Sequence, residues 1–135
     1  MKTKIGRVRV GQSVTICARV FDAYNPELLL LNRNGAIESI QYSLFKLKKG
    51  VFGEKVNPIQ GHMNVQVSTD CLLSDVQYSD SWTMDEYGYN FMMTPNIAET
   101  PLFQSPGRYR FRITILLTDI SANPIVFNQD VFVIP

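Results

Sequence analysis

The sequence predicts an all-β protein, a sandwich of about seven to eight mostly antiparallel strands. Three observations lead to this prediction. Apolar and polar residues alternate with a period of two in several segments, as they do in a strand with one buried face. Turn signals rich in Gly, Pro and Asn separate those segments. No window of more than ten residues has the apolar spacing of an amphipathic helix.

The composition fits one globular domain that covers residues 1–135. A chain of this length can bury roughly two thirds of its unfolded surface, which is enough for a core. Hydrophobic residues make up 45% of the chain and charged residues 19%, which argues against disorder. The net charge of +1 gives no electrostatic reason to expect a nucleic-acid partner.

Nothing in the sequence predicts membrane insertion. The longest apolar run is Leu28 to Leu31, far short of the ~20 residues that span a bilayer. The N-terminal stretch MKTKIGRVRVGQSV has basic residues but no apolar segment of a signal peptide. A cytoplasmic location is therefore favoured, although a mature exported domain restarted at Met1 would read the same way.

The N-terminal third contains two expected strands and one ambiguous segment. Residues 4–10 form the first expected strand, and residues 12–20 form the second. In the second strand one set of residues should face the core and the other solvent: Val14, Ile16, Ala18 and Val20 inward, Ser13, Thr15, Cys17 and Arg19 outward. The leucines that follow could form a strand or a short helical turn, and Asn34-Gly35 predicts a tight hairpin turn.

The middle of the chain has a long strand and a short one. Residues 36–48 alternate and end in a lysine-rich run, and residues 63–68 alternate again. We expect residues 53–60, which contain Pro58, to form a loop.

The clearest pattern is C-terminal. Residues 108–115 alternate without interruption after the turn Ser105-Pro106-Gly107. Three arginines should face outward, and four apolar residues inward: Tyr109, Phe111, Ile113 and Ile115. After a polar loop at residues 119–124, residues 125–134 should return as the second strand of a hairpin.

The run PGRYRFRI at residues 106–113, followed by a polar loop and the strand PIVF, resembles the end of an immunoglobulin-like or fibronectin type III domain. The resemblance implies an immunoglobulin-like β-sandwich with a tyrosine corner, built here from Gly107 and Tyr109. In such a corner the tyrosine hydroxyl bonds back to a nearby backbone group. The match is centred on residues 105–135.

This sequence departs from antibody domains, because it has no cysteine on the penultimate expected strand and because Trp82 is not in an early central strand. A bacterial or viral member fits better. The fold alone implies no particular function.

The stretch SWTMDEYGYNF at residues 81–91 holds the single tryptophan. Tyr87, Tyr89 and Phe91 have strand spacing, which would place all three on one face of a core strand entered through an irregular loop. The alternative is a binding platform for a sugar or small ligand, since aromatic residues lie beside polar acceptors. Its residues would be Trp82, Tyr78, Asp80, Asp85 and Glu86.

Carboxylates also suit Ca²⁺, but this acidic stretch, which begins at Asp75, lacks the order of a calcium loop. We expect no metal site and no cofactor. The single histidine, His62, should be a surface loop residue. Cys17 and Cys71 should be free thiols, since two cysteines make neither a disulfide framework nor a metal pattern.

No catalytic motif is present, so we do not expect an enzyme. The first hypothesis is a structural or interaction module that joins another protein or a larger assembly through a sheet edge or a loop end. The alternative is a carbohydrate- or small-ligand-binding module that uses Trp82 and its neighbours. The sequence specifies neither the partner nor the oligomeric state.

Overall fold

The fold is all-β and has two sheets. The computed structural model of the chain describes residues 2–3, 6–22, 25, 27–78, 82, 87–96, 101–119 and 121–135. Strands account for 56% of the chain, against 20–25% in ordinary proteins, and no α-helix occurs among the described residues. The expectation of an all-β protein with two packed sheets is therefore confirmed.

The smaller sheet has four antiparallel strands in the order β1-β3-β8-β7. Its strands are β1 (Lys2–Thr3), β3 (Ile16–Arg19), β8 (Tyr89–Met93) and β7 (Leu72–Gln77). A 3-10 turn, η1 (Thr69–Cys71), leads directly into β7.

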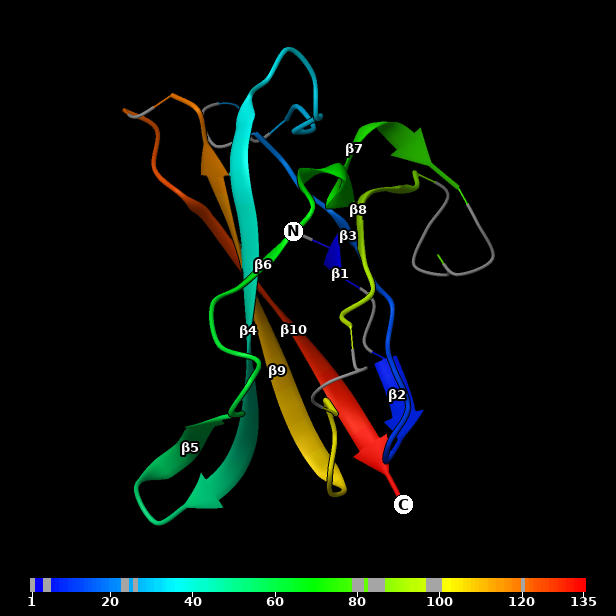
Figure 1. The fold of residues 1–135 in the computed structure, drawn as a ribbon, viewed down its shortest axis with the longest axis vertical. Coiled ribbons are helices and arrows are strands. Elements are labelled where there is room, and N and C mark those ends of the chain that lie inside the picture. The colour runs from blue at the N-terminus through cyan, green and yellow to red at the C-terminus, as the bar shows by residue number, and fades with distance from the viewer. Residues whose placement is uncertain are drawn as a thin grey trace.

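The larger sheet has the order β2-β10-β9-β4-β5, and the short strand β6 also pairs with β4 (Figure 1). Its strands are β2 (Gly6–Arg9), β10 (Ile125–Ile134), β9 (Gly107–Leu117), β4 (Ile37–Gly50), β5 (Gly53–Pro58) and β6 (Val65–Val67). The β2–β10 pair is parallel, and the other pairs of this sheet are antiparallel. The chain thus begins in the smaller sheet as β1 and crosses to the larger one as β2.

The structure has ten strands in its described residues, more than the seven to eight expected. The three that the sequence did not indicate are β1, β5 and β7. The long strands were predicted closely, because residues 36–48, 108–115 and 125–134 correspond to β4, β9 and β10.

One apolar core lies between the sheets. As expected, β9 turns Tyr109, Phe111, Ile113 and Ile115 inward, and all four are at most 1% exposed. Aromatic rings connect the layers: Phe91 of β8 meets Phe127 of β10 edge to face, with ring centroids 5.3 Å apart. Contacts of this kind stabilise more than their buried area alone.

Strand β3 is covered on both faces, so the expectation of a single buried face is wrong. Cys17 and Arg19, expected to face solvent, are 3% and 8% exposed. Cys17 packs in a second, smaller cluster with Trp82 and Tyr89, on the side of β3 away from the main core. The sequence pattern missed this because the covering residues come from a distant segment.

The aromatic residues of the stretch at 81–91 do not share one face, contrary to expectation. Tyr87 is 65% exposed, Tyr89 lies in the small cluster, and Phe91 lies in the main core. Gly88, with φ of +83°, redirects the chain just before β8.

Asn90 holds the end of the smaller sheet together. Its side chain is fully buried, and its Oδ1 accepts a hydrogen bond from the Val20 N–H at 2.6 Å. Its Nδ2 donates to the carbonyls of Val20, at 2.8 Å, and of Leu30, at 2.6 Å. Strand β3 ends at Arg19, so the amide supplies an acceptor to the Val20 N–H and a second donor to the Val20 carbonyl, which also accepts from the Leu30 N–H.

The leucine-rich segment before β4, for which the sequence allowed either a strand or a short helical turn, is extended. Phe21 and Leu29 form an isolated antiparallel bridge, and the Leu30 N–H donates to the Val20 carbonyl. A tight turn is present, since Asn34 and Gly35 both have positive φ, as a type I′ turn requires. It does not join a hairpin as expected, because β4 after it pairs with β9 while Leu29 before it bridges to Phe21.

Tyr109 makes the expected hydroxyl contact. It is 1% exposed, and its hydroxyl donates to the Ser105 carbonyl at 2.8 Å, four residues upstream. Gly107, between them, has φ of +146°, and a side chain there would also press on Lys46. This contact fixes the entry of the chain into β9.

Asn90→Ala should lower the free energy of unfolding by about 2 to 5 kcal/mol, because it leaves three buried backbone groups with lost partners. Urea denaturation would measure the loss. Asn128→Ala, at an exposed position of β10, is the control and should change stability by less than about 0.5 kcal/mol. A loss at Asn90 no larger than the control would contradict its bridging role.

Tyr109→Phe should cost about 1 to 3 kcal/mol, because the Ser105 carbonyl loses its donor while the ring still fills the core. Tyr78→Phe, in which the ring is 67% exposed, should be close to neutral. Equal denaturation midpoints for Tyr109→Phe and the unaltered protein would show that this hydroxyl does not stabilise the fold.

Candidate functional site: the β4–β5 hairpin

In the described part of the chain, the residues expected to form a ligand platform do not share one exposed surface. Trp82 is only 6% exposed, and its ring packs against Tyr89 with centroids 5.9 Å apart. Tyr78 is exposed. Asp80, Asp85 and Glu86 lie outside the described residues. Trp82 therefore offers little surface for stacking a ligand.

His62 is buried, so the expectation of a surface histidine is wrong. It is 2% exposed, and its Nδ1 lies 2.6 Å from the Tyr42 hydroxyl. The reason is local: the loop after β5 folds back on β4, where the Leu44 N–H donates to the His62 carbonyl and the Ile59 N–H donates to the Leu44 carbonyl.

A cleft of about 470 Å³ opens beside His62, with Tyr42 and Cys71 among its lining residues. Burial raises the pKa of the Tyr42 hydroxyl. Burial, helped by the charge of Asp70, also raises the pKa of the Cys71 thiol. Both groups therefore stay protonated at neutral pH, which suits hydrogen bonding and packing better than nucleophilic attack.

Both cysteines are free thiols, as expected, with Cys17 buried and Cys71 partly buried. In the part of the chain that the structure describes, no three His, Cys, Asp or Glu side chains gather as metal ligands would. The same residues include no helix with the length and apolar character needed to cross a membrane.

The most distinctive surface feature is the hairpin formed by β4 and β5. Strand β4 has fourteen residues and pairs with β9 only as far as Leu47, opposite Arg108. From Lys48 to Gly50 its only described strand partner is β5. The hairpin therefore diverges from β9 and projects from the body of the larger sheet (Figure 1). Residues 53–60 were expected to be a loop, and residues 53–58 of that segment instead form β5.

The hairpin ends in two fully exposed apolar side chains, Val51 at 93% and Phe52 at 104%. The flanking glycines make this turn. A Cβ on Gly50 would lie 2.7 Å from the Gly53 carbonyl oxygen, and Gly53 has φ of +122°. Neither requirement explains an apolar residue at the turn itself, where polar residues are usual. We call residues Gly50–Gly53 the hairpin tip.

Positive charge surrounds the tip. Lys48, Lys49 and Lys55 are all exposed. The acidic residue beside them, Glu54, forms an ion pair with Arg108, whose Nη1 lies 3.1 Å from the Glu54 carboxylate. The hairpin tip thus has two apolar side chains at its end and three exposed lysines beside it.

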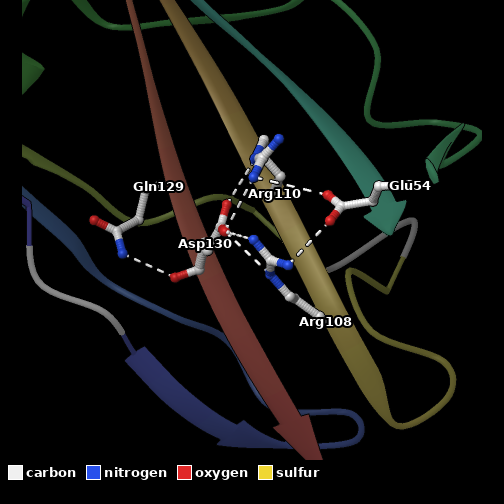
Figure 2. A network of polar contacts seen from close by, with 5 residues as sticks. All are labelled: Glu54, Arg108, Arg110, Gln129 and Asp130. Atoms are coloured by element: carbon white, nitrogen blue, oxygen red, sulfur yellow. Dashed lines mark hydrogen bonds and ion pairs between the residues drawn. The ribbon is translucent and has the colours of Figure 1, made fainter. Parts of the chain in front are cut away.

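A polar network connects the hairpin to the rest of the sheet (Figure 2). The Asp130 carboxylate on β10 accepts from Arg108 Nη2 at 2.6 Å and from Arg110 Nε at 2.7 Å. Glu54 reaches the same arginines from β5, 3.1 Å from Arg108 and 3.9 Å from Arg110. Four side chains from three strands therefore connect the end of the hairpin, at Glu54, to the outer face of the sheet.

The charges in this network set the pKa of Asp130. Its partial burial would raise the pKa of the carboxyl, but the hydrogen bonds from Arg110 and Arg108 outweigh burial and lower the pKa below its ordinary value. Asp130 therefore remains ionised, and its bracing contacts persist, through the neutral range.

A groove of about 650 Å³ lies along the outer half of the hairpin and reaches the tip at Gly50 and Gly53, with Leu47, Glu54 and Arg108 also among its lining residues. Leu47 lies on the outer side of β4 and is nevertheless 7% exposed. The groove thus presents mixed apolar and charged walls next to the tip.

No protein-family model, curated protein or solved structure matches this chain. The class that the observations define is an all-β, two-sheet protein with a projecting apolar and basic hairpin.

The sequence did contain a signal for this site. Gly50 and Gly53 bracket Val51 and Phe52, and lysines lie on both sides. The spacing is that of a two-residue hairpin connection, but the connecting residues are not the Asn-Gly or Asp-Gly pairs that usually identify one.

Asp130→Asn should lower the free energy of unfolding by about 1 to 2 kcal/mol at pH 7. The folded pKa of Asp130 is below the unfolded value of about 3.9, so its stabilisation is complete above that pH and is lost as the pH falls through the folded pKa. The difference from the unaltered protein should therefore shrink below about pH 4. Urea unfolding at several pH values measures it, with Asn128→Ala as the uncharged control. A difference that stays constant down to pH 2 would contradict the assignment.

Proposed function

We propose that this chain is an immunoglobulin-like β-sandwich that acts as a non-enzymatic assembly module and binds another protein through the tip of its β4–β5 hairpin. The observation that carries the proposal is the full exposure of Val51 and Phe52 at the end of a braced hairpin. The whole chain, residues 1–135, is taken as one such domain.

The strand order supports the immunoglobulin-like part of the proposal. Such domains pair strands A, B, E and D in one sheet and G, F and C in the other, with C′ added beside C in the variable type. With β1, β3, β4, β5, β7, β8, β9 and β10 taken as A, B, C, C′, D, E, F and G, the observed orders match this arrangement. Strands β2 and β6 are additional to it.

The Tyr109 contact supports the same reading, because a tyrosine corner lies near the start of strand F and bonds to the backbone a few residues upstream. The chain departs from antibody domains in having two free thiols in place of the disulfide between sheets. The two sheets are therefore held together by the hydrophobic core and not by a disulfide.

The exposure of Val51 and Phe52 at the hairpin tip has a cost in free energy that docking would remove. Each large apolar side chain left in water forgoes about 1.5 to 3 kcal/mol that burial would contribute. Aromatic residues that enter a partner's pocket commonly dominate interface energies. Bracing by Glu54, Arg108 and Asp130 reduces the entropy lost when the hairpin is immobilised.

The tip is a better docking element than the β5 edge. Lys55 and Pro58 lie on that edge, and lysine and proline on an edge strand oppose pairing with another strand. Phe52 lies in the turn before β5, where docking does not require pairing with the edge strand. The carbohydrate or small-ligand alternative is not favoured, since Trp82 is buried.

A photo-crosslinking amino acid placed at position 52 should give a discrete covalent adduct with a protein partner in cells of the native source. The control is the same substitution at Leu28, which is also apolar and is 57% exposed in a loop. We expect an adduct at position 52 and none at position 28, with mass spectrometry identifying the partner. No adduct at position 52, or equal labelling at both positions, would count against docking through the tip.

A further inference from the structure

A row of side chains crosses the outer face of the larger sheet from one edge to the other. The strand registers place five residues side by side: Arg7 of β2, Phe132 of β10, Arg108 of β9, Leu47 of β4 and Val56 of β5. Residues directly opposite each other on paired strands share a face, so all five lie on the side that carries Arg108. We call these five residues the outer row.

The outer row mixes cationic side chains with exposed apolar ones. Phe132 and Val56 are 41% and 44% exposed, and Arg7 is exposed beside Phe132. The pattern continues towards the end of β10, where Ile134 is 43% exposed and lies opposite Arg9. Arginine and aromatic residues are enriched in protein interfaces, whereas lysine and glutamate are depleted. The composition of this face is therefore typical of a surface that another protein covers.

Positive charge is concentrated on this sheet. Its strands contain nine of the 13 Lys and Arg residues of the chain but only three of the 12 Asp and Glu residues. The rest of the chain has more carboxylates than cations, so the net charge of +1 conceals a basic sheet. A surface charge of one sign steers association with a surface of the opposite sign.

The ion pairs drawn in Figure 2 neutralise only the arginines at the centre of this face. Among the described residues, no ion pair involves the other three arginines of the face: Arg7, Arg9 and Arg112. All three are exposed, and Arg112 lies over the ring of Phe45. A guanidinium can bind a carboxylate through two parallel hydrogen bonds, so these side chains fit acidic groups of a partner.

The groove at the hairpin connects the outer row to the hairpin tip. Its lining includes Leu47 and Arg108 of the outer row and Gly50 and Gly53 of the tip. The tip alone is smaller than the about 800 Å² that each partner contributes to a standard interface. Five strands spaced about 4.8 Å apart add a face about 20 Å wide, so the tip and the outer row together provide a surface of more suitable size.

We propose that the outer row and the hairpin tip together bind an acidic surface of an unlike protein. The carboxylates of that surface pair with the three available arginines, and its apolar side chains cover Phe132 and Val56. This inference rests on the proposed docking role of the hairpin and names the chemistry of its partner. It also accounts for the exposed lysines beside the tip, which meet the same acidic surface.

The exposed apolar side chains favour a protein over a nucleic acid. A phosphate backbone has no apolar groups to cover Phe132 and Val56, and the carboxylates of Glu54 and Asp130 lie among the arginines, where they would repel phosphates. A planar membrane also fits less well. The tip lies beyond the end of the sheet, whereas the outer row lies along its face, so a bilayer entered by the tip would leave the row in water (Figure 1).

A photo-crosslinking amino acid at position 132 of the whole chain, in cells of the native source, should form an adduct with the same protein as position 52. Mass spectrometry should locate both crosslinks in peptides with more Asp and Glu than Lys and Arg. Position 92 is the matched control, because Met92 is 42% exposed on a strand of the smaller sheet. It should give no adduct with that protein.

Charge reversal tests the arginines separately. Arg7→Glu should lower the yield of the position 132 adduct at least about fivefold, because it places a carboxylate against an acidic surface. Arg7→Lys keeps the charge and should retain at least about half of the yield. Arg33→Glu, at an exposed arginine outside the larger sheet, is the control and should change the yield less than about twofold. Unchanged urea midpoints would show that the variants are folded.

The outcomes separate the two proposals. An adduct at position 52 without one at position 132, or equal yields for Arg7→Glu and Arg33→Glu, would overturn the role of the outer row and leave docking through the tip intact. An acidic partner at position 132 with no adduct at position 52 would overturn docking through the tip, and with it the shared surface. Crosslinks to a basic peptide, a nucleic acid, a lipid or a second copy of this chain would overturn the choice of partner.

Discussion

Strand β4 continues beyond the end of its pairing with β9, and the projecting β4–β5 hairpin depends on this difference in length. Pairing with β9 ends at Leu47, while β4 continues to Gly50. On its other edge β4 pairs with β5 from Phe45 to Gly50, so β5, which follows a two-residue turn, provides partners for the backbone groups of Lys48–Gly50 that face it. A strand of fourteen residues, against the usual three to ten, therefore forces a hairpin to project into solvent.

A projecting hairpin would be poorly ordered if only its backbone held it. Here Glu54 crosses the face of β4 to reach the arginines of β9, which are themselves held by Asp130 of β10. A third arginine of β9, Arg112, shields an apolar residue on the outer face: it lies 4.9 Å over the ring of Phe45, which is 8% exposed. The lysines around the tip take no part in this described network, so the hairpin is braced by one set of charges and can offer another to a partner.

The sequence predicted the strands whose apolar residues alternate and missed β1, β5 and β7, which lack that alternation. Strand β9 alternates arginines with core residues, so its period identifies it. All six residues of β5 are exposed, so it has no apolar period to detect. His62 was misjudged for a related reason: the loop that buries it folds back on β4, which local spacing does not encode. The hairpin tip was visible as two glycines around Val51 and Phe52, but only the structure shows that it projects.

Amide hydrogen exchange of the unaltered protein and of the Glu54→Gln variant tests the central claim most directly, because it reports how readily each backbone segment opens. We expect faster exchange in the variant at residues 48–55, because the contact of Glu54 with Arg108 and Arg110 is weakened, with no change along the β2–β10 pair. Identical exchange of residues 48–55 in the two proteins would contradict the account.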